Sequence, residues 1–262
     1  MAILEFDEAG AARIDKSYAK RDVAAQRAFV MELLALQPGE RVLDIGSGPG
    51  YLISEMGAAV GPGGAVHGLD ASAAMNSIAG RRCADKPWVQ IDEGDALELP
   101  YADGTFDVAV STQVYEYVAD MPRALGEVHR VLRPGGRILI LDTDWDSLVW
   151  HTADRDLHRR VAAAWDEHLV HPHLPKVLAG LMRSAGFTVT AQRVHVLFNT
   201  ELDDDAFSAN TMHGIAEYVQ GRHGLTEADA AAWLADLKAR SDAGEYFFSL
   251  NRYVVIASAQ PA

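Results

Sequence analysis

The sequence has little cysteine, few basic side chains and no long apolar run, and each shortage excludes a class of protein. Cys83 is the only cysteine among 262 residues, so neither an internal disulfide nor a cysteine metal cluster can form. The 23 basic residues are outnumbered by 37 acidic ones, and the net charge of −14 disfavours nucleic acid and anionic membrane surfaces as partners. No apolar stretch approaches the roughly 20 residues that span a bilayer.

What is present is typical of a globular protein. Hydrophobic residues make up 49% of the chain and charged residues 23%, a balance that predicts a packed core. The N-terminal segment carries acids where a signal peptide needs a basic and then an apolar run. We therefore expect a cytoplasmic protein with one domain over residues 1–262, in which a homodimer is an open alternative to a monomer.

Short apolar segments alternate with helical segments in the first half of the chain. Strands are predicted at 41–45, 65–70, 88–91, 106–111 and 137–142, and helices at 23–36, 51–59, 71–82 and 124–132. Such alternation favours parallel strands with helices on both faces of the sheet.

The second half of the chain has a different character, with aromatic and histidine-rich helical segments between two long strands. Helices are predicted at 153–170, 203–220 and 226–240, and strands at 187–198 and 245–259. Because helices join these last strands, we expect one of them to run antiparallel to the rest.

A glycine-rich turn and three acids at strand ends indicate a ligand site. Residues 46–50 read Gly-Ser-Gly-Pro-Gly between a strand and a helix, where backbone N–H groups can approach a ligand closely. Asp44 precedes this loop and can accept hydrogen bonds from an ammonium group. Asp70 ends the second strand, where an acid can hold ribose hydroxyls, and Asp95 follows the third, where a carboxylate can accept from an adenine amino group.

Other interpretations of these residues are available. A glycine loop alone can be a tight turn without a ligand, and a single acid can be a helix cap. A nicotinamide dinucleotide is the second candidate cofactor, and an NAD(P)-dependent oxidoreductase the corresponding activity, but its loop requires the spacing G-x-G-x-x-G, which 46–50 lack.

Five segments in order carry a resemblance to a known family: VLDIGSGPG (42–50), GLDAS (68–72), GDALELP (94–100), FDVAVSTQVYEYV (106–118) and VLRPGGRILI (131–140). With them the chain resembles class I S-adenosylmethionine-dependent methyltransferases, in particular the small-molecule branch that includes ubiquinone and menaquinone biosynthesis methyltransferases. The resemblance implies an α/β, Rossmann-like, doubly wound fold with a mostly parallel seven-stranded sheet, an antiparallel last strand and a helical lid. It also implies a helical cap at 1–36, a cofactor-binding core at 37–142, and substrate-lid insertions at 143–186 and 199–244.

The same resemblance implies S-adenosylmethionine as cofactor and a set of residues that bind it. These are Tyr18, Arg27, Asp44, Gly46, Ser47, Gly48, Asp70, Ala71, Met75, Gly94, Asp95, Ala96, Ser111, Thr112 and Gln113. The sequence departs from the family at Ser47, where many members have cysteine, and at Glu116-Tyr117, where relatives often carry histidine.

The expected reaction is direct displacement of a methyl group onto a small molecule, in which the protein aligns the reactants and excludes water. A hydrophobic or aromatic acceptor is expected, contacted by Tyr115, Tyr117, Trp145, His171 and His173. No catalytic base and no metal site are assigned, because a packing role is the more common one for each histidine, and His168 lies on an apolar helical stripe. The alternative is a cofactor-binding protein of the same fold that does not methylate.

Overall fold

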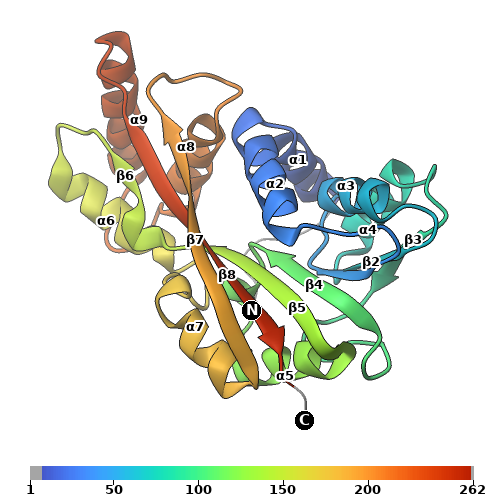
Figure 1. Ribbon diagram of the computed structural model, residues 1–262. Coiled ribbons are helices and arrows are strands. Elements are labelled where there is room, and N and C mark those ends of the chain that lie inside the picture. The colour runs from blue at the N-terminus through green and yellow to red at the C-terminus, as the bar shows by residue number, and fades with distance from the viewer. Residues whose placement is uncertain (1–7, 261–262) are drawn as a thin grey trace.

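The computed structural model describes residues 8–260, and in this part of the chain eight strands form a single sheet. The strand order is β3-β2-β1-β4-β5-β8-β6, and β7 pairs with β8 as well. Figure 1 shows the sheet running through the molecule. The strands are β1 (Arg41–Ile45), β2 (Ala65–Asp70), β3 (Val89–Glu93), β4 (Phe106–Thr112), β5 (Leu132–Thr143), β6 (Val149–Trp150), β7 (Phe187–Asn199) and β8 (Phe248–Ala259).

The strand directions confirm the predicted fold class. Strands β1 to β5 pair in parallel, and β8 is antiparallel to β5, β6 and β7. The predicted seven strands are all present. The eighth, β6, was not predicted because its two residues are defined only by their pairing with Ser249 and Phe248.

The described residues form eleven helices, two of them short 3-10 turns; nine lie in the chain up to α7 and two more follow. Their bounds are α1 (Glu8–Tyr18), α2 (Arg21–Leu34), α3 (Tyr51–Val60), α4 (Ala73–Arg82), η1 (Tyr115–Tyr117), α5 (Met121–Val131), η2 (Trp145–Ser147), α6 (Arg155–Asp166), α7 (Pro175–Ser184), α8 (Phe207–Tyr218) and α9 (Glu227–Asp242). None of them is both long enough and apolar enough to cross a membrane.

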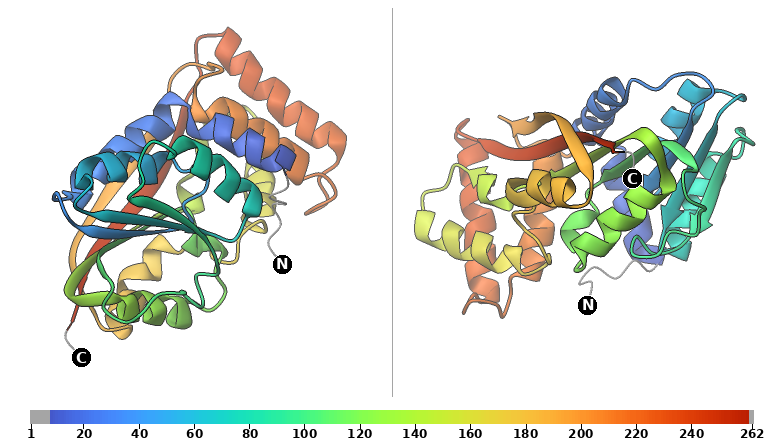
Figure 2. Two further views of the ribbon diagram at one scale, coloured as in Figure 1. Left: turned by 90° about the vertical axis from the view of Figure 1, so that its right-hand side faces the viewer. Right: turned by 60° about the horizontal axis from the view of Figure 1, so that its bottom comes forward.

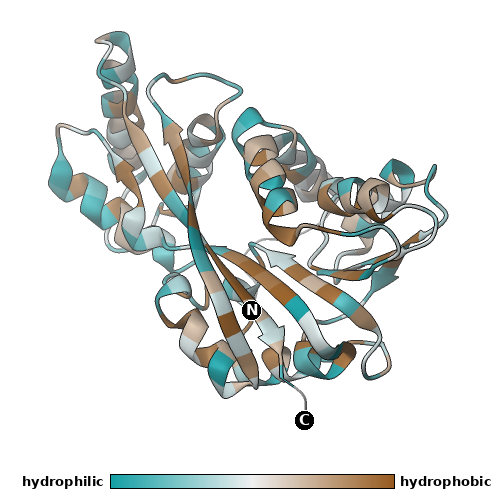
Figure 3. Cartoon of the chain, in the orientation of Figure 1, coloured by the Kyte–Doolittle hydropathy of each residue, from teal (hydrophilic) through white to brown (hydrophobic). Residues whose placement is uncertain are grey.

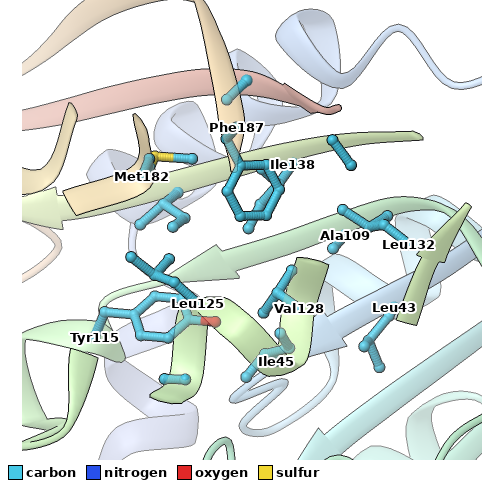
Figure 4. Packing of buried hydrophobic residues seen from close by; sticks show 14 of the residues in the cluster. Leu43, Ile45, Ala109, Tyr115, Leu125, Val128, Leu132, Ile138, Met182 and Phe187 are labelled. Atoms are coloured by element: carbon cyan, nitrogen blue, oxygen red, sulfur yellow. The ribbon is translucent and has the colours of Figure 1, made fainter. Parts of the chain in front are cut away.

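Alternating strand residues build one hydrophobic core on each face of the sheet. On one face, Leu43, Ala109 and Ile138 pack with α5 and α7. Figure 4 shows this cluster from close by. On the other face, the neighbouring positions Val42 and Val108 pack with α2, α3 and α4. The period of two along each strand therefore places helices on both sides, as the sequence pattern predicted.

A third hydrophobic cluster lies away from the central sheet, between α6, α8 and α9. Its largest members are four tryptophans, all at most 9% exposed: Trp145, Trp150, Trp165 and Trp233. Figures 1 and 2 show the three helices gathered beyond one end of the long strands β7 and β8. In Figure 3 the strands β4 and β5 are largely hydrophobic along their length, whereas α6 presents a hydrophilic surface.

Two α-helices in the described residues, α1 and α7, were not predicted individually, and one local prediction is confirmed. Helix α1 lies in the segment assigned to the helical cap, and α7 begins with Pro175. Thr226 and Asp229 form a complete capping box at the start of α9. His168 is 3% exposed and stacks on Trp165 at 3.7 Å between ring centroids, so its predicted packing role is confirmed.

Candidate cofactor and acceptor site

The loop after β1 needs glycine for two physical reasons. Gly46 has a φ of +75°, and a Cβ built there would lie 2.1 Å from Cγ2 of Val114. Gly50 has a φ of +83°, and a Cβ there would lie 2.8 Å from the backbone of Ala79 on α4. The loop therefore combines a left-handed backbone with close contact to two neighbouring segments, a conformation that only glycine adopts without strain.

Asp44 is a buried carboxylate without a counter-charge in the described residues. It is 2% exposed, and its Oδ1 atom has no hydrogen-bond partner there. Burial, together with the nearby charge of Asp70, raises the pKa of Asp44 to about 8. Such a group fits a cationic ligand such as an ammonium ion, which would restore the ionised form. Beside it, the buried Ser47 hydroxyl also lacks a partner.

Asp70 fastens the glycine loop to the end of β2. Its Oδ2 atom accepts a hydrogen bond from the Gly48 N–H at 2.9 Å, and its Oδ1 atom accepts one from the Ser72 N–H at 2.9 Å. Burial raises the pKa of Asp70, whereas these two hydrogen bonds lower it. Ala71 follows Asp70 as an exposed residue, and Met75 is 2% exposed on α4.

A narrow cavity of about 10 Å³ joins the loop to helices α1 and α2. Six of the predicted site residues line it, and five further residues complete the lining. They are Tyr18, Arg27, Asp44, Gly46, Ser47 and Thr112, followed by Val23, Gln26, Val30, Tyr51 and Leu52. The structure therefore brings together the part of the predicted site that lies nearest to Asp44.

The predicted adenine-side residues lie at the neighbouring strand end, outside the lining of this cavity. The Gly94 N–H donates to the Asp70 carbonyl at 3.2 Å, which connects the β3 turn to the ribose-side acid. Asp95 is exposed and accepts from the Leu97 N–H at 2.8 Å, and Ala96 is half-buried. The three acids occupy the carboxyl ends of the adjacent strands β1, β2 and β3, as the sequence predicted.

The residues at the end of β4 are held by hydrogen bonds to both neighbouring strands. The buried Ser111 hydroxyl donates to the Ile45 carbonyl at 3.0 Å. Gln113 has a φ of +60°, and its backbone N–H donates to the Leu141 carbonyl at 2.8 Å. Thr112 lies between them and lines the cavity. This segment is therefore rigidly placed at the edge of the site.

The predicted acceptor residues are divided between two environments. Tyr115 is fully buried in the cluster of Leu125 and Ile45, where Figure 4 shows its ring packed among aliphatic side chains, and it belongs to the core between the sheet and α5. Tyr117 and Trp145 instead lie against His168, with ring centroids at 6.4 Å and 5.3 Å.

His171 and His173 lie in the loop that follows α6. The His171 N–H donates to the Glu116 carbonyl at 2.9 Å. His173 lies beside Asp144 and Asp146, a group of three whose ligand atoms are close enough for a metal ion. The Lys176 ammonium, however, forms ion pairs with both acids, so an internal cation already balances their charge.

Sequence reasoning missed four polar residues next to this site. Glu116 and Asp142 are 2% and 0% exposed, and Arg252 is 5% exposed on β8. Arg252 donates through Nη1 to Oε1 of Gln26, which lines the cavity. The available signals were an acid at one more strand end and a single arginine inside an apolar strand. Neither signal shows which residues contact these side chains, because the contacting residues are far apart in the sequence.

Comparison with known proteins agrees with this geometry. The family model described as "Methyltransferase domain" matches residues 43–140. The demethylmenaquinone methyltransferase of Alkalihalophilus pseudofirmus is 33% identical over 62% of this chain and 76% of its own length. An uncharacterized 37.1 kDa protein in transposon TN4556 of Streptomyces fradiae is 34% identical over 90% of this chain and 67% of its own length.

A solved structure extends the comparison to the fold. Protein BH2331 of Bacillus halodurans C-125 has a TM-score of 0.65 at 16% identity, and the match covers 90% of this chain and all of that one. The chain spans less than half the length of some curated quinone methyltransferases that it matches, 43% and 48% in two cases. The matched motifs, the fold and the relatives together show that this chain belongs to the class I S-adenosylmethionine-dependent methyltransferase family.

Proposed function

We propose that this protein transfers the methyl group of S-adenosylmethionine to a small hydrophobic or aromatic acceptor. The observation that carries the proposal is Asp44 beside the glycine loop, a buried carboxyl group whose Oδ1 atom has no hydrogen-bond partner among residues 8–260 and whose pKa is raised to about 8. A methionine ammonium is the kind of cation that this carboxylate lacks. Bound S-adenosylmethionine would supply an activated methyl group, so that its transfer needs no further electrophilic assistance.

In this proposal the residues of the chain bind and orient the cofactor. Gly46, Ser47 and Gly48 offer backbone and hydroxyl groups to its methionine end, next to Asp44 and under Tyr18 and Arg27. Asp70 holds the ribose through lone pairs that Gly48 and Ser72 leave free, and Asp95 with Gly94 and Ala96 faces the adenine edge, near Ala71 and Met75. The hydrogen-bonded segment at the end of β4 borders the acceptor region; it consists of Ser111, Thr112 and Gln113.

The acceptor region is proposed to lie under the helices α6, α8 and α9. Tyr117, Trp145 and Trp165 meet His168 there in a cluster of aromatic rings. Helix α7 packs on the sheet through Leu178 and Met182, so the proposed lid excludes that part of the 143–186 insertion. Aromatic walls with few polar groups favour a flat, hydrophobic metabolite.

Two measurements test the proposal. Calorimetry with S-adenosylhomocysteine should give one binding site per chain, and radiolabelled S-adenosylmethionine should transfer label to a member of a panel of small aromatic acceptors. Binding without transfer to any acceptor would favour a non-methylating role for this fold. Absence of binding would contradict the proposal as a whole.

A further inference from the structure

A row of polar side chains along one face of the sheet leads away from Asp44. Asp44 on β1 and Thr112 on β4 both line the cavity. Thr143 on β5 is the register partner of Arg252 on β8, so these two side chains share a face of the sheet. Strand alternation places them on the face of Val110, Leu141 and Val254, which is also the face of Asp44.

Arg252 lies at the end of this row, and its charge acts on Glu116 of η1. Both side chains have an unused polar atom. Nε of Arg252 and Oε2 of Glu116 are buried and have no hydrogen-bond partner in the described residues. Gln26 connects Arg252 to the cavity through a hydrogen bond. The half-buried Tyr18 lies in the electrostatic range of Asp44 and Asp70 on one side and of Arg252 and Glu116 on the other. All four charged groups therefore act on Tyr18, which lines the cavity.

We propose that Glu116 is the catalytic base of the acceptor site, which takes a proton from the nucleophilic group of the acceptor while Arg252 stabilises the negative charge left behind. This inference rests on the proposed function. The acceptor X–H gives its proton to the Glu116 carboxylate, and the electron pair of X forms a bond to the methyl carbon. The bond from that carbon to sulfur breaks with its electron pair on sulfur, and the proton on Glu116 is later released to solvent.

The charges around Glu116 agree with this role. Asp142 on β5 accepts from the Val114 N–H, and burial together with Glu116 raises the pKa of Asp142 well above its usual value, which favours its neutral form. Burial raises the pKa of Glu116 to about 7, although Arg252 opposes this shift. The other titratable groups around Glu116 are Tyr18 from α1, Tyr117 from η1, and His168 and His171 from the loop after α6. Both tyrosines stay neutral near pH 7 because burial raises their pKa, and burial lowers that of His168 to about 4.

The first test uses binding of 4-nitrophenol to protein saturated with S-adenosylhomocysteine, followed by absorbance between pH 6 and 9. If Glu116 contacts the hydroxyl of the bound probe, the complex keeps one proton between the phenol oxygen and the Glu116 carboxylate. The two groups then carry one negative charge together. Wild-type affinity should then fall as the pH rises above neutrality, approaching tenfold per pH unit, whereas Glu116→Gln should keep a constant affinity. Equal pH profiles for the two proteins, or no binding of the probe, would overturn the inference.

The second test measures methyl transfer to the acceptor panel by wild type, Glu116→Gln and the matched control Glu32→Gln, whose carboxylate is exposed on α2. Glu116→Gln should lose about 10²- to 10⁴-fold in rate at pH 7 and recover above the pKa of the acceptor, where the acceptor ionises without help. In wild type the rate should rise through neutral pH as Glu116 ionises, and Glu116→Asp, which keeps a carboxyl group, should show the same rise. A constant loss at every pH, or no loss, would overturn the role of Glu116. Calorimetry with S-adenosylhomocysteine separates this failure from a failure of the proposed function, because it tests the cofactor site alone.

Discussion

At the scale of single residues, the site is marked by carboxyl groups that are buried without full compensation. Asp44, Glu116 and Asp142 are each at most 2% exposed, and burial raises the pKa of all three. Structural acids are normally paired or exposed, so uncompensated burial indicates that a ligand supplies the missing partner. The sequence alone identified Asp44, because its place before a glycine loop is local information. It could not identify Glu116, whose environment is formed by β5 and β8.

Asp44→Asn should remove part of a pH dependence of stability. The folded-state pKa of Asp44 is about 8, against 3.8 as the reference, so the folded protein binds more protons than the unfolded chain between those values. The free energy of unfolding of the cofactor-free protein should therefore fall as the pH rises from about 4 to 8, by up to about 1.4 kcal/mol per unit of pKa shift.

Urea denaturation of wild type and Asp44→Asn at pH 5 and pH 8 measures this effect. Between pH 5 and pH 8 the free energy of unfolding should fall less in Asp44→Asn than in wild type. Some fall should remain in the variant, because Glu116 and Asp142 also have raised pKa values. Parallel pH profiles would show that Asp44 is ionised in the cofactor-free protein.

Asp70→Ala should weaken binding of S-adenosylhomocysteine. Loss of charge-assisted hydrogen bonds to the ribose would cost about 1.5–3 kcal/mol, or roughly a 10- to 150-fold rise in Kd by calorimetry. The same substitution removes the acceptor of the Gly48 and Ser72 N–H groups, so the unfolding midpoint should fall too. Asp85→Ala, at an exposed carboxylate, is the control. An unchanged Kd would show that the ribose is held elsewhere.

At the scale of elements, the strands and most helices of the first half could be predicted, because each follows from a local apolar period. The strands at 41–45 and 65–70 were predicted at their observed bounds. Helix α7 was missed although Leu178 and Met182 have helical spacing, since Pro175 and Gly180 suggest a loop. Strand β6 has no local signal at all and exists through β8 alone.

The glycine loop gives a matched pair of substitutions at this scale. Gly46→Ala places a Cβ against the stiff Val114 side chain in a left-handed backbone, whereas Gly48→Ala meets open space at a φ of +53°. In both variants the free energy of unfolding should fall by roughly 1–2 kcal/mol, because alanine is strained in a left-handed backbone. Gly46→Ala should lose about 1–3 kcal/mol more from overpacking.

Chemical denaturation of the two variants measures the difference. Adding Val114→Ala to Gly46→Ala should recover part of the loss, since it removes the methyl groups that the new Cβ meets. Equal stability of the two single variants would contradict the close contact at Gly46.

At the scale of the whole molecule, the hydrophobic residues form two clusters on the faces of the sheet and a third away from it. The sheet with α2, α3, α4, α5 and α7 carries the residues proposed to bind the cofactor, whereas α6, α8 and α9 form a separate aromatic cluster beyond the long strands. The predicted sequence motifs stop near the end of β5, and the matched family model ends at residue 140. Local motifs therefore name candidate cofactor residues, whereas the proposed acceptor half depends on contacts between α1, η1 and β8 that no local pattern encodes.

The central claim is that Asp44 stays protonated until a cationic ligand reaches it, and one measurement tests this directly. S-adenosylhomocysteine is titrated into the protein at pH 7 by calorimetry in buffers of different ionisation enthalpy, which gives the number of protons released on binding. The account predicts release of about one proton by wild type, because the ammonium group lowers the pKa of Asp44, and a much smaller release by Asp44→Asn. Equal proton release by the two proteins, or none by wild type, would contradict it.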